Sequence, residues 1–234
     1  VDGYVAPDLT ILNDIVTKSG INEMAYQQEP DSILWCVRDD GVFVGLTYQR
    51  AENVVAWHQH KLGGTFGAGA SATGYGVVES VATISGELTE DELYVIVKRT
   101  INGATKRYVE CFAPFDFDET TSTDFKFLDS HLIYSGSSTT TLSGLDHLEG
   151  QTVSILADGS THATKVVSSG SITLDRSVTS AVVGLSYDSV LQTMRVEGGA
   201  AEGTSQGKTK RISKVVLRLF ETVGAKVGPS LTSL

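Results

Sequence analysis

Residues 33–62 read ILWCVRDDGVFVGLTYQRAENVVAWHQHKL, and this stretch decides the fold class. It holds three runs rich in β-branched and aromatic residues, separated by Asp39-Asp40-Gly41 and by Ala51-Glu52-Asn53. Such runs, bounded by turn residues, are typical of short strands. Gly41 permits the positive φ that a tight turn requires. The stretch therefore predicts a three-stranded antiparallel meander.

The same pattern returns further along the chain, in VVESVATISG (77–86), ELYVIVKRT (92–100) and TKRYVECF (105–112). An Asn102-Gly103 turn joins the last two runs, and Tyr94 opens its strand 59 residues after Trp35 opens the earlier one. Repeated meanders of this length resemble the blades of a β-propeller. Two copies cannot close a propeller, so we expect either missing blades or an open fold.

The flanking segments complete the expected architecture, which is mostly β with one short N-terminal helix. Residues 7–20 have nearly helical apolar spacing, and residues 21–30 are expected to form an extended connector. Seven short runs within 126–198, with turns at Gly144 and Gly159, predict a small β-sandwich or barrel. We expect domains at 1–125 and 126–200, followed by a flexible link and C-terminal strands at 201–234.

Composition narrows the class of protein. The chain has 234 residues, 41% of them hydrophobic, and a formal net charge of −10. That charge argues against a surface that wraps nucleic acid, because phosphates are bound mainly by Lys and Arg. No run approaches 18 consecutive apolar residues, so no membrane insertion is expected. Cys36 and Cys111 are expected to be buried as small hydrophobic residues.

Several groups could carry chemistry, and each has a simpler structural interpretation. His58 and His60 share one face of a strand beside Trp57, but no third metal ligand is evident, which favours packing or a subunit contact. The acidic residues that could bind calcium, and are interpreted as a solvated linker, are Asp116, Asp118, Glu119 and Asp124. The acids that could pair in a glycosidase, and are interpreted as turns, caps or surface, are Glu92, Glu110, Asp146 and Glu149.

The sequence contains no G-x-S-x-G elbow, P-loop, H-E-x-x-H or dinucleotide fingerprint. We therefore expect no catalytic residues, no cofactor and no metal, and the prediction is that the chain is not an enzyme. Five of the 18 basic residues gather within eleven positions, as Lys208, Lys210, Arg211, Lys214 and Arg218. They form either a solvated strand face or a stripe that docks on an acidic neighbouring subunit.

Four segments together resemble a known family: MAYQQEPDSILWCVRDDGVFVGLTYQR, VVAWHQH, ELYVIVKRTINGATKRYVE, and LSGLDHLEGQTVSILADG followed by GSITLDRSVTSAVVGLSY. Their order is similar to that in the tail tubular protein B or nozzle family of short-tailed bacteriophages and in related prophage tail proteins. The resemblance runs from about residue 8 to residue 220. Members of that family are much longer, so it implies that this chain is a portion of one.

The resemblance implies a part of the phage tail that is made in the bacterial cytoplasm and resides in the virion. Its partners would be copies of itself, in a hollow homo-oligomeric ring, and other tail proteins. DNA would pass through the ring without specific binding. An acidic wall suits that task, because it repels phosphates within a Debye length of about 8 Å at physiological salt.

A second function of a different kind stays open at this point. A tail-associated β domain could bind a host surface glycan, with Trp57, Tyr75 and Tyr187 as an exposed stacking platform. Depolymerase activity would further require two acids that converge beside that platform.

Overall fold

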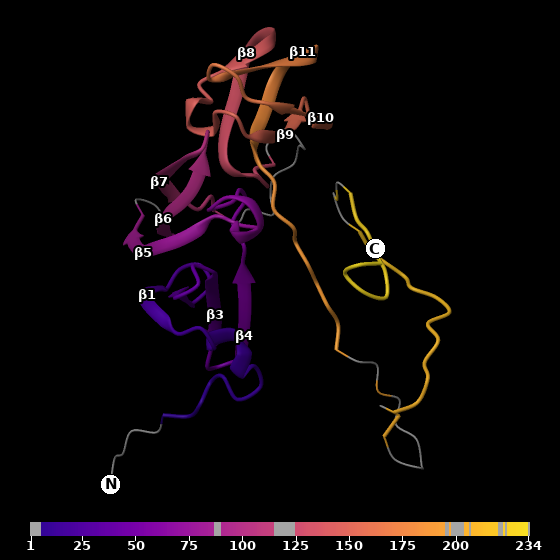
Figure 1. Cartoon of the computed structure of the whole chain (residues 1–234). Coiled ribbons are helices and arrows are strands. Elements are labelled where there is room, and N and C mark those ends of the chain that lie inside the picture. The colour runs from indigo at the N-terminus through magenta and orange to yellow at the C-terminus, as the bar shows by residue number, and fades with distance from the viewer. Residues whose placement is uncertain are drawn as a thin grey trace. The chain divides into compact units, whose positions relative to one another are not determined.

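The computed structural model describes residues 6–86, 90–114, 125–194, 197, 204–205, 207–219, 222 and 224–233. The described chain is mostly β, with three antiparallel sheets and short 3-10 turns (Figure 1). It divides into two compact units, residues 1–187 and residues 188–234. All three sheets belong to the first unit, and the mostly β class expected from the sequence is confirmed.

The first sheet is a four-stranded meander, β1 (Ile21–Gln27), β2 (Ile33–Arg38), β3 (Phe43–Gln49) and β4 (Val54–His60). The expectation of a connector over 21–30 was wrong, because β1 pairs with β2 from Ile21 to Gln27. Its burial alternates along the strand, with Met24 and Tyr26 exposed. The meander therefore has one more strand than the sequence predicted.

The second sheet is a three-stranded meander, β5 (Val77–Ser85), β6 (Asp91–Ile101) and β7 (Ala104–Cys111). Burial alternates residue by residue along β6, so one face is apolar and covered while the other faces water. The covered face packs against the first sheet in a shared core of Trp35, Val37, Phe43, Leu62, Val78, Val81, Leu93, Val95 and Val97. The two meanders thus pack face to face around one core.

The other face of the first sheet is covered by the N-terminal segment. Val16 lies in η1 (Asp14–Thr17) and packs with Cys36, Val42 and Val44. The expected helix is only this 3-10 turn, because Ile11, Leu12 and Ile15 stay exposed, and one buried residue per turn does not hold a longer amphipathic helix in place.

The third sheet has the order β10-β9-β11-β8, with β8 (Asp129–Ser143), β9 (Thr152–Ala157), β10 (Ser160–Val166) and β11 (Ser171–Leu185). Four of the expected runs merge into the two fifteen-residue strands β8 and β11, which bend at three register shifts. This open, bent sheet and its connections form a separate core of thirteen buried residues, which include Leu142, Leu148 and Val183.

Hairpin turns lie where the sequence placed them. Gly41, Gly103, Gly144 and Gly159 all have positive φ. Asn102 (φ 48°) precedes Gly103 (φ 73°), and Asp158 (φ 46°) precedes Gly159 (φ 73°). Two consecutive residues with positive φ characterise the type I′ turn, whose twist matches that of the flanking strands.

Gly45 is needed for a different reason, because its partner across β3 and β4 is His58. A Cβ at Gly45 would lie 2.2 Å from Cε1 of His58. We expect Gly45→Ala to lower the free energy of unfolding by about 1–3 kcal/mol, since the imidazole must leave its packed position. Urea unfolding measures the loss, and Gly74→Ala, where a Cβ meets nothing within 4 Å, is the matched control. Equal stability of the two variants would contradict this account.

The second unit contains no strand and no helix in its described residues. The expected strand at 191–197 is absent from described residues 191–194, and the expected C-terminal strands are absent from 207–219 and 224–233. A β-strand needs a neighbouring strand for its backbone hydrogen bonds, and no strand is paired with these described segments. Among the described residues, no helix is long and apolar enough to cross a membrane.

Candidate functional site

The sheet β5-β6-β7 leaves one face uncovered, and we call this face the outer face. It carries Ile84, Tyr94, Ile96 and Val109. Ile96 of β6 lies opposite Val109 of β7, and Tyr94 of β6 lies opposite Ala82 of β5, two residues before Ile84. Ile84 is 56% exposed and Val109 is 71% exposed. Large apolar side chains gathered on one ordered face are typical of a protein contact surface.

Charged side chains form one border of the outer face. A register shift in β5 between Val78 and Ser80 places Glu79 against both Lys98 and Arg107. The carboxylate lies 2.7 Å from Nζ of Lys98 and 2.6 Å from Nε of Arg107. Hydrogen bonds from Arg107 and Lys98 hold the pKa of Glu79 below its usual value. The border therefore stays charged at neutral pH, and Lys98 also lies 4.4 Å from the Phe66 ring centroid.

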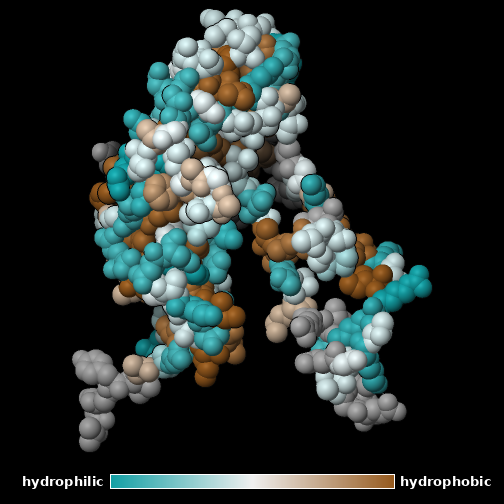
Figure 2. Space-filling model, viewed as in Figure 1, coloured by the Kyte–Doolittle hydropathy of each residue, from teal (hydrophilic) through white to brown (hydrophobic). Residues whose placement is uncertain are grey.

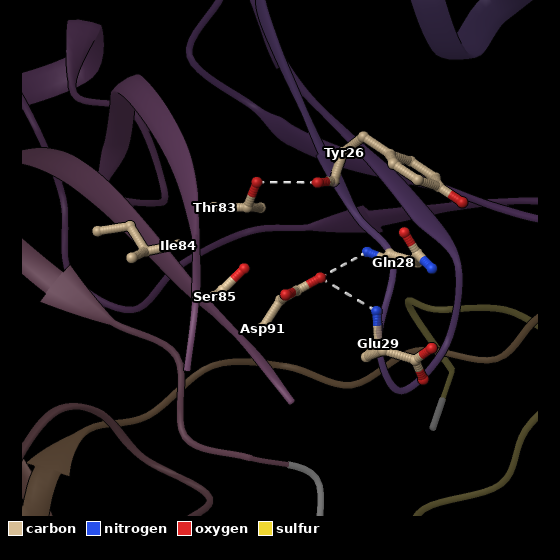
Figure 3. Close-up of a pocket in the computed structure, with 7 residues that line it drawn as sticks. All are labelled: Tyr26, Gln28, Glu29, Thr83, Ile84, Ser85 and Asp91. Carbon is tan, nitrogen blue, oxygen red and sulfur yellow. Dashed lines mark hydrogen bonds between the residues drawn. The ribbon is translucent and has the colours of Figure 1, made fainter. Parts of the chain in front are cut away.

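An open groove of about 340 Å³ adjoins the outer face at Ile84 (Figure 3). Asp91 accepts hydrogen bonds from the backbone N–H groups of Gln28 and Glu29, and Thr83 donates to the carbonyl of Tyr26. The remaining lining residues are Ile84 and Ser85. These bonds fasten β1 to the second sheet, so the polar groups of the groove serve mainly to hold the two sheets together.

His58 and His60 lie together on β4, as the sequence predicted, and their rings share a hydrogen bond of 2.7 Å between Nδ1 of His58 and Nε2 of His60. Both rings contact Trp35, and His60 also lies near Phe43 and Phe112. Burial, and then the charge of His58, lower the pKa of His60 to about 4. Among the described residues, no three His, Cys, Asp or Glu side chains gather as metal ligands. The pair is a neutral part of the aromatic core.

The predicted aromatic platform is not assembled. Trp57 donates its indole N–H to the carbonyl of Leu9 and, with Tyr75, packs on the Val16 cluster under the N-terminal segment. Tyr187 lies at the end of the first unit and does not belong to that cluster. The expectation that these three rings form one exposed surface was wrong, because two of them cover the first sheet.

A buried ion pair and its hydrogen bonds, which were not predicted from the sequence, connect β6, β7 and β8. Arg99 of β6 is fully buried and binds both carboxylate oxygens of Glu110, at 2.5 and 3.0 Å. Its Nε donates to the carbonyl of Gly63, whose N–H donates to Asp129 at the start of β8. Burial raises the pKa of Asp129. Arg99 occupies an inward position of the alternation on β6, and this signal could have identified it.

The other acids singled out from the sequence have structural partners or lie elsewhere. Glu92 accepts a hydrogen bond from Tyr94, and Glu149 accepts from the N–H groups of Ser169 and Gly170. Asp146 lies in the first turn of η4 (Asp146–Leu148). The acids weighed for calcium, Asp116, Asp118, Glu119 and Asp124, lie outside the described residues.

The two thiols differ in their environment. Cys36 is buried in the Val16 cluster, as expected, and burial raises its pKa. Cys111 is exposed on the edge strand β7, so the expectation of two buried thiols was wrong for this residue. Both are free cysteines.

In the second unit, Lys208, Lys210 and Arg211 are exposed.

The chain matches no protein-family model, and comparison with curated proteins finds no significant match.

Proposed function

We propose that this chain is a structural component of a bacteriophage tail, of the tubular or nozzle type, and that it works by assembly and not by catalysis. The observation that carries the proposal is the outer face, where ordered strands expose Ile84 and Val109 around the half-buried Ile96, beside charged residues. An apolar centre with a charged rim is the usual composition of a protein contact surface. The ordered sequence segments that resemble tail proteins indicate which assembly it joins.

The proposed partners are further copies of the chain and other tail proteins, in a hollow ring within the virion. The net charge of −10 supports passage of DNA without specific binding, because a negatively charged wall repels phosphates. Host attachment would then be a property of the assembled tail. Stacking on a host glycan would require exposed rings, whereas Trp57 and Tyr75 pack against the Val16 cluster.

The proposal predicts that antibodies against this chain label the tails of phage particles released by the bacterium that encodes it. Electron microscopy with gold-labelled antibodies measures this, and pre-immune serum is the control. Labelling confined to heads, or to material not attached to particles, would contradict the proposal.

A further inference from the structure

The second unit carries a segment with the pattern of a β-strand, and this segment is paired with no strand in the described part of the chain. Residues 212–219 read ISKVVLRL, with Val215, Leu217 and Leu219 on one side, while the other side alternates Ile212 and Val216 with Lys214 and Arg218. A period of two is typical of a strand with one apolar face. The apolar members of this segment are between 52% and 77% exposed, and Figure 2 shows apolar atoms at the surface of the second unit.

The first unit offers a matching edge. Among the described residues, β4 and β7 are edge strands whose ladders run without a register shift, whereas β8 and β10 are interrupted. Only β7 also borders the outer face, through Val109 and Cys111. β7 is eight residues long, which equals the length of 212–219. Such an edge, with unpaired N–H and C=O groups, is a template for an added strand.

Charge favours the same association. Residues 188–234 contain seven Lys and Arg and four Asp and Glu, so this unit has a net charge of +3. Residues 1–187 contain eleven basic and 24 acidic residues, a net charge of −13. Opposite net charges speed encounter and favour one partner over others.

We propose that residues 212–219 of one copy add as a strand to the β7 edge of a second copy. Val215, Leu217 and Leu219 then extend the apolar band of the outer face beside Val109. A second copy is the partner because, among the residues that the structure describes, neither the segment nor the outer edge of β7 is paired with a strand. The inference rests on the proposed function and specifies how its subunits are joined.

Disulfide trapping with Cys111, which is already exposed on β7, tests the contact directly. One full-length copy keeps Cys111, while a second copy of different tag size carries Cys111→Ser and one new cysteine at each position from 214 to 219 in turn. Mild oxidation should give a mixed dimer on a non-reducing gel, with the highest yield at one position and little at its immediate neighbours, because adjacent strand residues point to opposite faces and Cys111 reaches only a nearby thiol. Uniform yields, or no mixed dimer, would overturn the proposal. A disulfide that forms within one chain carrying both thiols would also overturn the proposal.

Association measurements separate this inference from the function on which it rests. The double variant Val215→Asp/Leu217→Asp should weaken self-association about a hundredfold or more, because two apolar side chains lose their buried position. Ile133→Asp, which places one negative charge at an exposed apolar residue of β8, should not. If the double variant associates like the wild type, the strand inference fails while the assembly proposal stands. If the wild type stays monomeric and antibodies do not label tails, the proposed function itself fails.

Discussion

Glu110→Ala is expected to lower the free energy of unfolding by about 3–5 kcal/mol, because it leaves a charged guanidinium buried without its partner. Arg99 has no exposed surface and donates hydrogen bonds to both carboxylate oxygens of Glu110. Its Nε donates a hydrogen bond to the carbonyl of Gly63, which cannot neutralise the charge. Urea unfolding measures the loss.

Two controls accompany this prediction. Glu79→Ala removes a partner of Lys98 and Arg107 at a more exposed ion pair, and should cost clearly less. Arg99→Met combined with Glu110→Leu removes both charges and should recover most of the stability, since apolar residues often replace a buried ion pair without loss. A Glu110→Ala variant as stable as Glu79→Ala would contradict the burial of the charge. Hydrogen exchange should show the loss most strongly in β6 and at the start of β8.

Acidification from about pH 6.5 to pH 4 is expected to destabilise the chain by up to about 3 kcal/mol through His60. The folded-state pKa of His60 is about 4, whereas an unperturbed imidazole titrates near 6.5. The unfolded chain therefore binds more protons in this interval, and stability is complete above it and falls as the pH drops through it. The rings around His60 include the apolar rings of Trp35 and Phe112 and the imidazole of His58. None of them carries a negative charge that could stabilise a protonated His60.

His60→Gln should flatten this pH dependence, while Gln59→His, at an exposed position of the same strand, should leave it unchanged. Burial raises the pKa of Asp129, so that carboxyl contributes with the opposite sign. The difference between the wild type and His60→Gln isolates the imidazole. An identical pH profile for these two proteins would contradict the neutral, buried pair.

Runs of β-branched and aromatic residues between turn residues predicted β2 to β7. Burial on one face alternates clearly along β6, whereas β2 and β3 are buried on both faces. β1 was missed, since its strand character depends on pairing with β2 and not on a run of apolar residues. The long strands β8 and β11 looked like separate short ones because Gly136 and Arg176 interrupt the apolar pattern, although a bulge tolerates such residues.

The candidate site was predictable in part. The His58 and His60 contact follows from their spacing, but its aromatic surroundings come from β2, β3 and Phe112, which only the fold brings together. The outer face could be anticipated from β6 once its inward residues were known. The strand character of residues 212–219 depends on a partner, and for that reason a single chain leaves it unformed.

Sedimentation velocity of the full chain over about a hundredfold range of concentration tests most directly the claim that its exposed strands recruit further subunits. The account predicts a mass above that of one chain that increases with concentration, and that returns toward the monomer in the Val215→Asp/Leu217→Asp variant. A monomer at every concentration would contradict it.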